Sequence, residues 1–397
     1  MIGVTNEQLC CGCGVCVAVC PKDCITMTVG TLGAVFPAVD AEKCINCGKC
    51  DAVCPMGHAD EMKNPSEEQA VYAAYAQNPQ IRNSGSSGGM FGTIATHLLS
   101  RGYRVYGAAF DGEMKLRCVC ADTKEELNPL CKSKYLQSDM SGAYERIRGD
   151  LREGKKVLFV STPCQVAALK GYLQKNYDNL LTVDFLCHGV PSQQLFDQCK
   201  AYEEEKHSYK ILSFAFRTKI HGGATPHYFT ITTEKGGKKR EITKPYFRSA
   251  FYAFFQKYIS LRESCYDCIF AEQKRVSDLT IADFHDIEKY VPEINRFDGV
   301  STVIVNTEQG KQLFTEIKSQ LWTKVFTMSE MLEDKVLFAE KTKRPAGRDQ
   351  FAEDYANMDF SAFVDCNLDK KRYALFAVYY KLPKAVRRLL KKLCHIE

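Results

Sequence analysis

Two cysteine-rich runs constrain this chain more than any other feature. CCGCGVCVAVCP begins at residue 10 and CINCGKCDAVCP begins at residue 44. Each run contains the spacing C-x2-C-x2-C-x3-C and ends in proline. The cysteines at these positions are Cys10, Cys13, Cys16, Cys20, Cys44, Cys47, Cys50 and Cys54. A duplicated run of this kind is typical of a small domain that holds two [4Fe-4S] clusters.

The fourth cysteine of each run is expected to bind the cluster of the other run. The predicted ligands of the first cluster are Cys10, Cys13, Cys16 and Cys54. Those of the second cluster are Cys44, Cys47, Cys50 and Cys20. Cys11 and Cys24 are left as spare thiols that pack without binding iron. The alternative is structural zinc, but zinc sites usually pair two short knuckles and take four ligands in total, which fits two complete runs poorly.

Length and composition limit the possible domain count, compartment and partners of the protein. At 397 residues it is too long for one ordinary domain. A net charge of +5 is mild for this length and does not predict a nucleic-acid partner. The first residues, MIGVTNEQLC, have neither the basic nor the apolar region of a secretory signal, and no apolar stretch is long enough to span a bilayer. We therefore expect a cytoplasmic protein, in which 20 cysteines favour metal or redox chemistry over disulfides.

The larger body is predicted to be α/β. After a polar linker at residues 57–68, AVYAAYA reads as a strand, MFGTIATHLLSRG as a helix and YRVYGAAFD as a strand. KKVLFVSTPCQVAALKGYL and LLTVDFLCHGVPSQQLFDQC each read as strand, turn and helix. TTEKGGKKREITKPYF reads as a hairpin that turns at Gly236 and Gly237.

Four further cysteines form a candidate third site. Two of them end buried strands, at the sheet edge where α/β proteins bind ligands, and two form a C-x2-C pair. They are Cys164, Cys187, Cys265 and Cys268. Spacing alone does not decide between a cluster and four buried thiols, since free cysteine is often a core residue.

The glycine-serine loop NSGSSGG precedes the predicted helix of residues 90–102. A helix N-terminus after such a loop suits a phosphate or the edge of an electron-rich ring. A flexible surface loop is the alternative.

In chain order, the two cysteine runs are followed by SGSSGGMFG, SKYLQSD, STPCQVAALKG, FLCHGVPS and SCYDCIFAEQKRVSDLTIADF. This combination resembles the coenzyme F420 hydrogenase/dehydrogenase β-subunit family, in a version with a fused N-terminal ferredoxin. The similarity extends from the first cysteines to about Leu321. It implies an iron-sulfur flavoprotein that binds FAD and passes electrons between clusters and a two-electron acceptor, such as the deazaflavin coenzyme F420.

The resemblance also implies roles for individual residues. It implies a third [4Fe-4S] cluster on Cys164, Cys187, Cys265 and Cys268. The candidate flavin contacts are Ser86, Ser87, Gly88, Gly89, Ser133, Lys134 and Gln137. Lys134 is the candidate to place a positive charge near a reduced flavin, with an ordinary surface lysine as the alternative. His285 lies in IADFHD, where the family often has glycine before its aspartate; it is a candidate proton donor or else a structural residue.

The predicted function is that of an FAD- and iron-sulfur-dependent oxidoreductase acting on a small substrate, with a ferredoxin or partner oxidoreductase as electron donor or acceptor. The alternative is an electron-transfer or adaptor subunit without a substrate site of its own. The tail KLPKAVRRLLKKLCHIE reads as a basic amphipathic helix. Membrane contact through this helix is considered, but packing on its own domain is favoured.

The predicted fold class is α+β and α/β. A small ferredoxin-like βαβ domain is followed by a larger α/β flavin-binding body and a helical C-terminal extension. The predicted domains are a ferredoxin-type domain, an N-terminal α/β domain, a C-terminal domain for flavin and third cluster, and the extension: residues 1–60, 68–150, 151–322 and 323–397.

Overall fold

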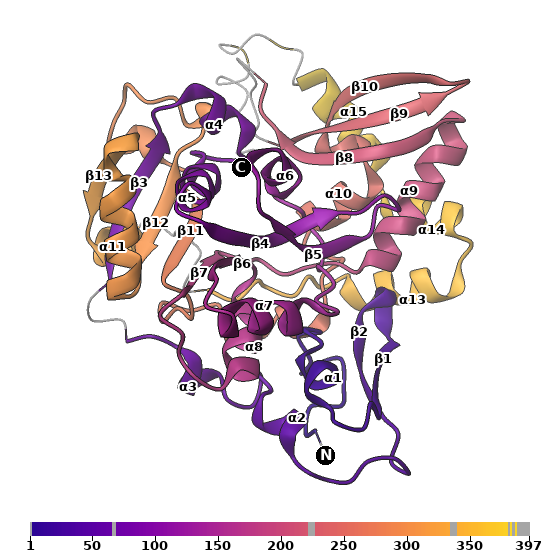
Figure 1. The fold of residues 1–397 in the computed structure, drawn as a ribbon. Coiled ribbons are helices and arrows are strands. Elements are labelled where there is room, and N and C mark those ends of the chain that lie inside the picture. The colour runs from indigo at the N-terminus through magenta and orange to yellow at the C-terminus, as the bar shows by residue number, and fades with distance from the viewer. Residues whose placement is uncertain are drawn as a thin grey trace.

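The computed structural model describes residues 2–65, 69–220, 227–333, 340–379, 382 and 386. Figure 1 shows an N-terminal module at one end, an eight-stranded sheet in the middle and a three-stranded sheet beside the C-terminal helices. The tail that we predicted to be a basic amphipathic helix lies, apart from two single residues, outside the described part of the chain.

The N-terminal module surrounds the two cysteine runs with short elements. These are α1 (Val15–Val19), β1 (Ile25–Val29), the 3-10 turn η1 (Thr31–Gly33), β2 (Val35–Val39), α2 (Lys49–Ala52) and α3 (Ala59–Met62). β1 and β2 pair antiparallel. The predicted βαβ order is therefore wrong for this module. Only a short turn separates the two strands, whereas a parallel pair needs a crossover of about a dozen residues or more.

The segment predicted as a polar linker is anchored to the body in its described part. It contains α3, and the backbone N–H of Asn64 donates to the carbonyl oxygen of Arg275 at 2.7 Å. The Asn64 side-chain amide donates to the Ser277 carbonyl oxygen at 2.8 Å. Lys63 forms an ion pair with Glu272. These contacts hold the end of the N-terminal module close to the segment that follows Cys268.

The eight-stranded sheet is mixed. Its strands are β3 (Ala70–Ala76), β4 (Tyr103–Phe110), β5 (Leu116–Ala121), β6 (Lys156–Val160), β7 (Leu180–Phe185), β11 (Leu279–Asp283), β12 (Ser301–Val305) and β13 (Leu321–Phe326), in the order β13-β3-β12-β11-β7-β6-β4-β5. The central pairs β4–β6, β6–β7 and β7–β11 are parallel, and the outer pairs are antiparallel. Strands from residues 68–150 and 151–322 thus share one sheet.

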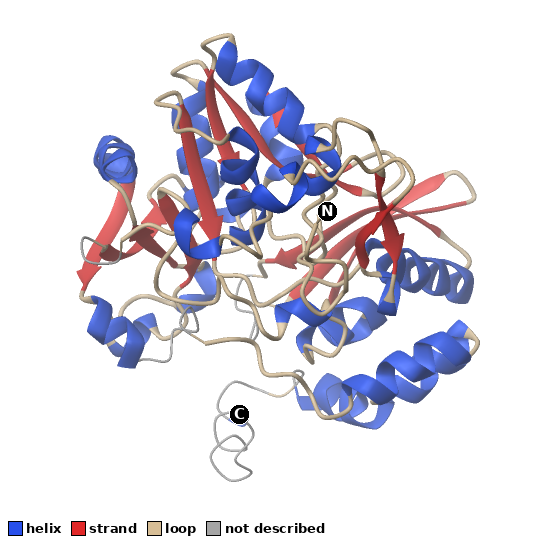
Figure 2. Cartoon of the chain, turned by 90° about the horizontal axis from the view of Figure 1, so that it is seen from below, coloured by secondary structure: helices blue, strands red, loops and turns tan. Residues whose placement is uncertain are grey.

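Helices cover both faces of this sheet (Figures 1 and 2). They are α4 (Pro79–Ser84), α5 (Met90–Leu99), α6 (Lys124–Leu127), η2 (Asn128–Leu130), α7 (Ala143–Arg152), α8 (Pro163–Leu173), α9 (Gln193–His207), α11 (Glu308–Ile317) and η7 (Lys318–Gln320). α7 and α8 pack between the sheet and the N-terminal module in one hydrophobic core. α5 and α11 pack in a second core on the opposite face.

An antiparallel sheet of order β10-β9-β8 lies beside the larger one: β8 (Lys210–Thr218), β9 (Tyr228–Lys235) and β10 (Lys238–Pro245). The predicted hairpin is confirmed, because Lys235 pairs with Lys238 across a two-residue turn. Gly236 and Gly237 have φ of 58° and 74°, as the tight turn requires.

The remaining elements follow the small sheet or connect strands. They are η3 (Tyr246–Arg248), α10 (Ala250–Gln256), η4 (Glu263–Cys265), η5 (Ile287–Lys289), η6 (Arg296–Asp298), α12 (Met328–Glu333), α13 (Arg348–Asn357), α14 (Phe360–Asn367) and α15 (Lys370–Tyr379). Phe254 of α10 contacts Phe351 and Phe363 at ring-centroid distances of 5.0 and 5.6 Å, which ties α13 and α14 to the aromatic core. The predicted helical C-terminal extension is thereby confirmed over its described part. None of the described helices is long and apolar enough to cross a bilayer.

Candidate iron-sulfur sites and their junction

The first cysteine loop, residues 10–16, turns tightly because Gly12 and Gly14 adopt φ of 66° and 74°. The backbone N–H of Gly12 donates to the sulfur of Cys10 at 3.2 Å. Gly14 is the N-cap of α1, so Cys16 lies in the first turn of that helix. Tight loops with N–H groups directed at sulfur are the arrangement that stabilises cluster thiolates.

The predicted ligands of the first cluster come from two segments that meet. Burial raises the pKa of the Cys16 thiol to about 12, and the neighbouring thiols of Cys10 and Cys54 add to the rise. The structure therefore brings the fourth cysteine of the second run beside the first cysteine loop. Cys13 lies in the same loop and is 7% exposed.

The second run lies nearer the surface. Burial raises the pKa of the Cys50 thiol, and the Cys20 thiol adds to the rise, so these two predicted ligands are neighbours. The sulfur of Cys24 lies 3.4 Å from that of Cys20 and also contacts Cys44. Cys47 is exposed. Cys24, which the sequence left as a spare thiol, thus lies inside the second group of cysteines.

The four cysteines of the third site line one cavity of about 50 Å³, which we call the four-thiol cavity. Cys164 follows β6 and lies in the first turn of α8, where Pro163 occupies the first helical position. Cys187 follows β7, and the Cys265–Cys268 pair lies in and just after η4. The structure therefore gathers all four predicted thiols beside the carboxyl ends of the neighbouring parallel strands β6 and β7.

The thiols of this cavity are mutual neighbours. Burial raises the pKa of Cys187 well above its ordinary value, and the thiols of Cys265, Cys164 and Cys268 add to the rise. Gly189 has a φ of 110° and its N–H donates to the Cys187 sulfur at 3.4 Å. A deprotonated thiolate at this depth needs compensating positive charge, which the iron of a cluster supplies when bound.

Soft sulfur donors in a mostly apolar cavity fit an iron-sulfur group by their chemistry. Within the residues that the structure describes, no three His, Cys, Asp or Glu side chains converge as the ligands of a single metal ion do. All described cysteines are free of disulfides.

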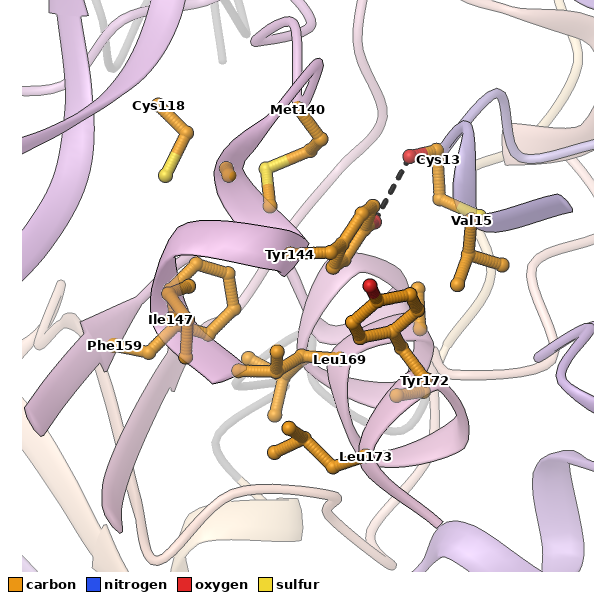
Figure 3. Packing of buried hydrophobic residues seen from close by; sticks show 14 of the residues in the cluster. Cys13, Val15, Cys118, Met140, Tyr144, Ile147, Phe159, Leu169, Tyr172 and Leu173 are labelled. Atoms are coloured by element: carbon orange, nitrogen blue, oxygen red, sulfur yellow. Dashed lines mark hydrogen bonds between the residues drawn. The ribbon is translucent and has the colours of Figure 1, made fainter. Parts of the chain in front are cut away.

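The first cysteine loop lies directly against the four-thiol cavity. Cys11 lines that cavity together with Cys164, and the neighbouring thiols of Cys13 and Cys164 both influence its pKa. The Tyr144 hydroxyl of α7 donates to the Cys13 carbonyl oxygen at 2.8 Å (Figure 3). Cys11, the other thiol that the sequence left as spare, therefore bridges two predicted cluster sites.

Four side chains of the body hold this loop in place, and we call them the junction: Gln137, Tyr144, Arg262 and Ser264. The Gln137 side-chain amide donates to the carbonyl oxygens of Cys11 and Gly12 at 2.7 and 2.9 Å. The Ser264 hydroxyl donates to the Cys10 carbonyl oxygen at 2.8 Å. Residues distant in the sequence thus satisfy the backbone acceptors of the first cysteine loop.

The two loops predicted to contact flavin meet in the structure. The backbone N–H of Ser133 donates to the Ser86 hydroxyl oxygen at 2.7 Å. The Ser87 hydroxyl donates to the Val300 carbonyl oxygen at 2.8 Å, next to β12. The serines of the glycine-serine loop are half-buried. Their hydrogen bonds connect this loop to the Ser133 loop and to the residue before β12.

Close packing within the chain accounts for the two glycines of this loop. A Cβ on Gly88 would lie 2.5 Å from the Ala74 carbonyl oxygen and 2.8 Å from the Ser301 nitrogen. Gly89 has a φ of 84°, and a Cβ there would lie 2.9 Å from Arg82. These positions require glycine because α5 starts against β3, β12 and α4.

The other predicted site residues, Lys134, Gln137 and His285, have separate surroundings. The Lys134 ammonium donates to the carbonyl oxygens of Pro129 and Cys131, each at 2.7 Å. Gln137 belongs to the junction, on the side of the first cysteine loop. His285 is exposed and follows Asp283 at the end of β11.

A polar cluster that the sequence did not reveal lies beside the glycine-serine loop. Arg217 is 8% exposed and has a φ of 57°, at an irregularity in the pairing of β8 with β9. Its guanidinium donates to Asp283 at 2.7 Å and to the Tyr135 hydroxyl at 3.1 Å. Burial would raise the pKa of Asp283, but Arg217 overcomes this and lowers it to about 2. No local motif marks Arg217, because the pairing joins residues 66 positions apart.

The surroundings of Lys134 can be tested through the pH dependence of the free energy of unfolding. Burial lowers its pKa to about 7, from an ordinary value of about 10.4. Between these two values the unfolded chain binds a proton that the folded chain has released, so the free energy of unfolding is expected to rise with pH. Lys134→Met should lose that rise.

Denaturant unfolding between pH 6.5 and 9 measures the difference between the wild type and Lys134→Met. Substitution of the exposed Lys238 by methionine is the control, and it should follow the wild type. Parallel curves for the wild type and Lys134→Met would show that the surroundings of Lys134 do not lower its pKa.

Comparisons with known proteins agree with these observations. Two family models describe the coenzyme F420 hydrogenase/dehydrogenase beta subunit. The model of its N-terminal part matches residues 71–145, and the model of its C-terminal part matches residues 154–330. A "4Fe-4S dicluster domain" model matches residues 9–58, and a second model of that description matches residues 36–84. Curated proteins gave no significant match.

Solved structures include a more distant similarity. A chain of the F420-reducing [NiFe] hydrogenase complex from Methanosarcina barkeri, solved as a xenon derivative, has 16% sequence identity and a TM-score of 0.43, covering 79% of this chain and 92% of that one. This likeness is too distant to assign any residue. From the family models, the chain belongs to the coenzyme F420 hydrogenase/dehydrogenase beta-subunit family and carries a 4Fe-4S dicluster domain at its N-terminus.

Proposed function

We propose that the chain is an iron-sulfur flavoprotein that moves electrons between two clusters in the N-terminal module, a third cluster in the four-thiol cavity, and a two-electron acceptor. The ligands we assign are Cys10, Cys13, Cys16 and Cys54 for the first cluster, Cys44, Cys47, Cys50 and Cys20 for the second, and Cys164, Cys187, Cys265 and Cys268 for the third. The family match supports iron-sulfur chemistry in an oxidoreductase subunit.

One observation carries this proposal: the first cysteine loop lies against the four-thiol cavity. Cys11 belongs to that loop and lines the cavity together with Cys164. Two cluster sites in contact form a continuous route from the exposed second run, through the first cysteine loop, to the interior of the body. The junction holds the loop at that position.

FAD is the cofactor we propose beyond the clusters. When bound, a flavin exchanges single electrons with iron-sulfur clusters and electron pairs with a substrate. Gly88, Gly89, Lys134 and Gln137 have partners or close packing inside the chain. Ser86, Ser87 and Ser133 also form hydrogen bonds within the chain, so we assign the flavin no position from these seven residues.

A small substrate, coenzyme F420 or another two-electron acceptor, is proposed to meet the chain near the end of β11. Arg217 and Asp283 are paired there beside the glycine-serine loop. His285 is exposed next to this pair, which suits a residue that holds a proton at the surface. The ion pair between Arg217 and Asp283 holds one positive and one negative charge in place near the end of β11.

An adaptor subunit without its own substrate site is the second candidate. The exposure of the second run favours it, since Cys47 is exposed and Ile45 is 58% exposed. A partner protein can approach this end of the N-terminal module. In that case, electrons would enter or leave here and the reaction would be completed on the partner.

Anaerobic purification with iron, sulfide and flavin quantified per chain tests the proposal. Three clusters predict about 12 iron and about 12 sulfide atoms, together with one FAD. Reoxidation of the reduced chain by F420 alone would support the enzyme, whereas reoxidation only after a partner oxidoreductase is added would support the adaptor. A colourless, zinc-loaded preparation would refute both.

A further inference from the structure

Four arginines in the described part of the chain are at least nine-tenths buried. Three of them contact a carboxylate: Arg217 with Asp283 at 2.7 Å, Arg275 with Asp184 at 3.2 Å, and Arg348 with Glu263 at 3.4 Å. The fourth, Arg262, is 3% exposed, and no described carboxylate lies within 4 Å of it. A buried charge without an ionic partner is costly.

The hydrogen-bond acceptors around Arg262 are all neutral. Its guanidinium donates to the carbonyl oxygens of Val35 and Cys10 at 2.7 and 3.3 Å. Two further donors reach the side-chain oxygen of Gln137 at 3.1 and 2.5 Å. These bonds satisfy N–H groups and fix the orientation of the side chain. They do not neutralise its positive charge.

Arg262 lies between two of the predicted cluster sites. Its guanidinium covers Gly12 of the first cysteine loop so closely that a Cβ there would lie 2.6 Å from the Arg262 Cζ. The backbone carbonyl oxygen of Arg262 accepts from the N–H of Cys265 at 3.0 Å, and Gln137, to which the guanidinium donates, lines the four-thiol cavity. The same cation therefore lies beside the first cysteine loop and beside the wall of the four-thiol cavity.

We propose that Arg262 is the shared counter-ion of the first and third clusters and raises the reduction potential of both. The proposal rests on the proposed function, because the missing negative charge is that of the thiolate-bound clusters. Reduction adds one electron to a cluster and no proton. A fixed positive charge in a buried site stabilises the more negative, reduced form more than the oxidised form.

Arg262→Gln in the cluster-loaded chain tests this role. It removes the charge and keeps a shorter polar side chain that can still donate hydrogen bonds. In an anaerobic redox titration followed by electron paramagnetic resonance, the reduction equilibrium constants of the first and third clusters are expected to fall at least tenfold. That equals a decrease of about 59 mV for a one-electron couple. The second cluster, beyond the first, should shift less. Arg262→Lys keeps the charge and should retain potentials close to the wild type.

Arg348→Gln is the matched control, because Arg348 is equally buried and its partner Glu263 keeps a second contact with Arg344. It should leave the cluster potentials unchanged. If Arg262→Gln does not assemble, Gln137→Glu supplies the guanidinium with a carboxylate instead and should lower the same two potentials. Wild-type potentials in a fully loaded Arg262→Gln or Gln137→Glu chain would overturn the proposal. A wild-type chain without reducible clusters would refute the proposed function and this inference with it.

Discussion

Replacing Cys164 by alanine is expected to reduce the iron content from about 12 to about 8 atoms per chain, because each [4Fe-4S] cluster needs its four thiolates. Cys164 lines the four-thiol cavity, as does Cys11 of the first cysteine loop. The two clusters of the N-terminal module should remain, since their predicted ligands come from other segments. Alanine is preferred to serine because a serine oxygen can itself bind iron.

Electron transfer should fail together with the third cluster. Stopped-flow absorbance follows the rate at which the reduced N-terminal clusters reduce bound flavin. Loss of a residue that only supports a metal ligand typically lowers activity roughly 10–100-fold. Because Cys164→Ala removes a ligand itself, we expect the rate to fall by more than this. Cys199→Ala is the control: Cys199 is 5% exposed in a separate aromatic core and should keep all the iron. Full iron content or an unchanged flavin rate in Cys164→Ala would refute the third-cluster assignment.

Gly12→Ala is the second substitution with a large expected effect. The φ of 66° costs a residue with a Cβ about 1–2 kcal/mol. The new methyl group would also lie 2.6 Å from the Arg262 Cζ and 2.9 Å from the Gln137 Nε2. Moving these two side chains breaks buried hydrogen bonds to the first cysteine loop, each worth about 1–3 kcal/mol when a partner is left unpaired. The expected total is at least about 3 kcal/mol.

Gly14→Ala separates the cost of backbone strain from the cost of displacing the junction side chains. Gly14 has a φ of 74°, but a Cβ there meets no atom within 4 Å. This variant should cost only the backbone strain of about 1–2 kcal/mol. Anaerobic denaturant unfolding and the rate of iron release measure both variants. Equal effects of Gly12→Ala and Gly14→Ala would show that the junction does not hold the loop.

Local patterns predicted a large part of this fold. Alternation and helical periodicity identified β4, α5, β6, α8, β7 and α9, and the Gly236–Gly237 turn identified the hairpin. The expected βαβ order of the N-terminal module was wrong, because a short turn between β1 and β2 allows only an antiparallel pair. Cys187 follows the end of β7 as predicted, whereas Cys164 lies in the first turn of α8 after β6, and their role as ligands stays a prediction.

Other features depended on contacts between distant segments. The sequence treated Cys11 and Cys24 as spare, and the structure places each within a group of predicted ligands. Gly88 and Gly89 suggested a cofactor loop, whereas their immediate neighbours are backbone atoms of β3, β12 and α4. The spacing of residues in the sequence could not predict the neighbours of these cysteines and glycines, because those neighbours come from distant segments of the chain.

By itself, the sequence determined the chemistry of the predicted ligands and the order of the elements that it identified in the body, since cysteine spacing and hydrophobic periodicity act over a few residues. Only the tertiary structure decided how the cysteine groups are connected. Arg262 is 252 residues from Cys10 in the chain, yet it donates to its carbonyl oxygen. The position of this charge beside two predicted cluster sites is therefore set by packing between the N-terminal module and the body, which no local pattern encodes.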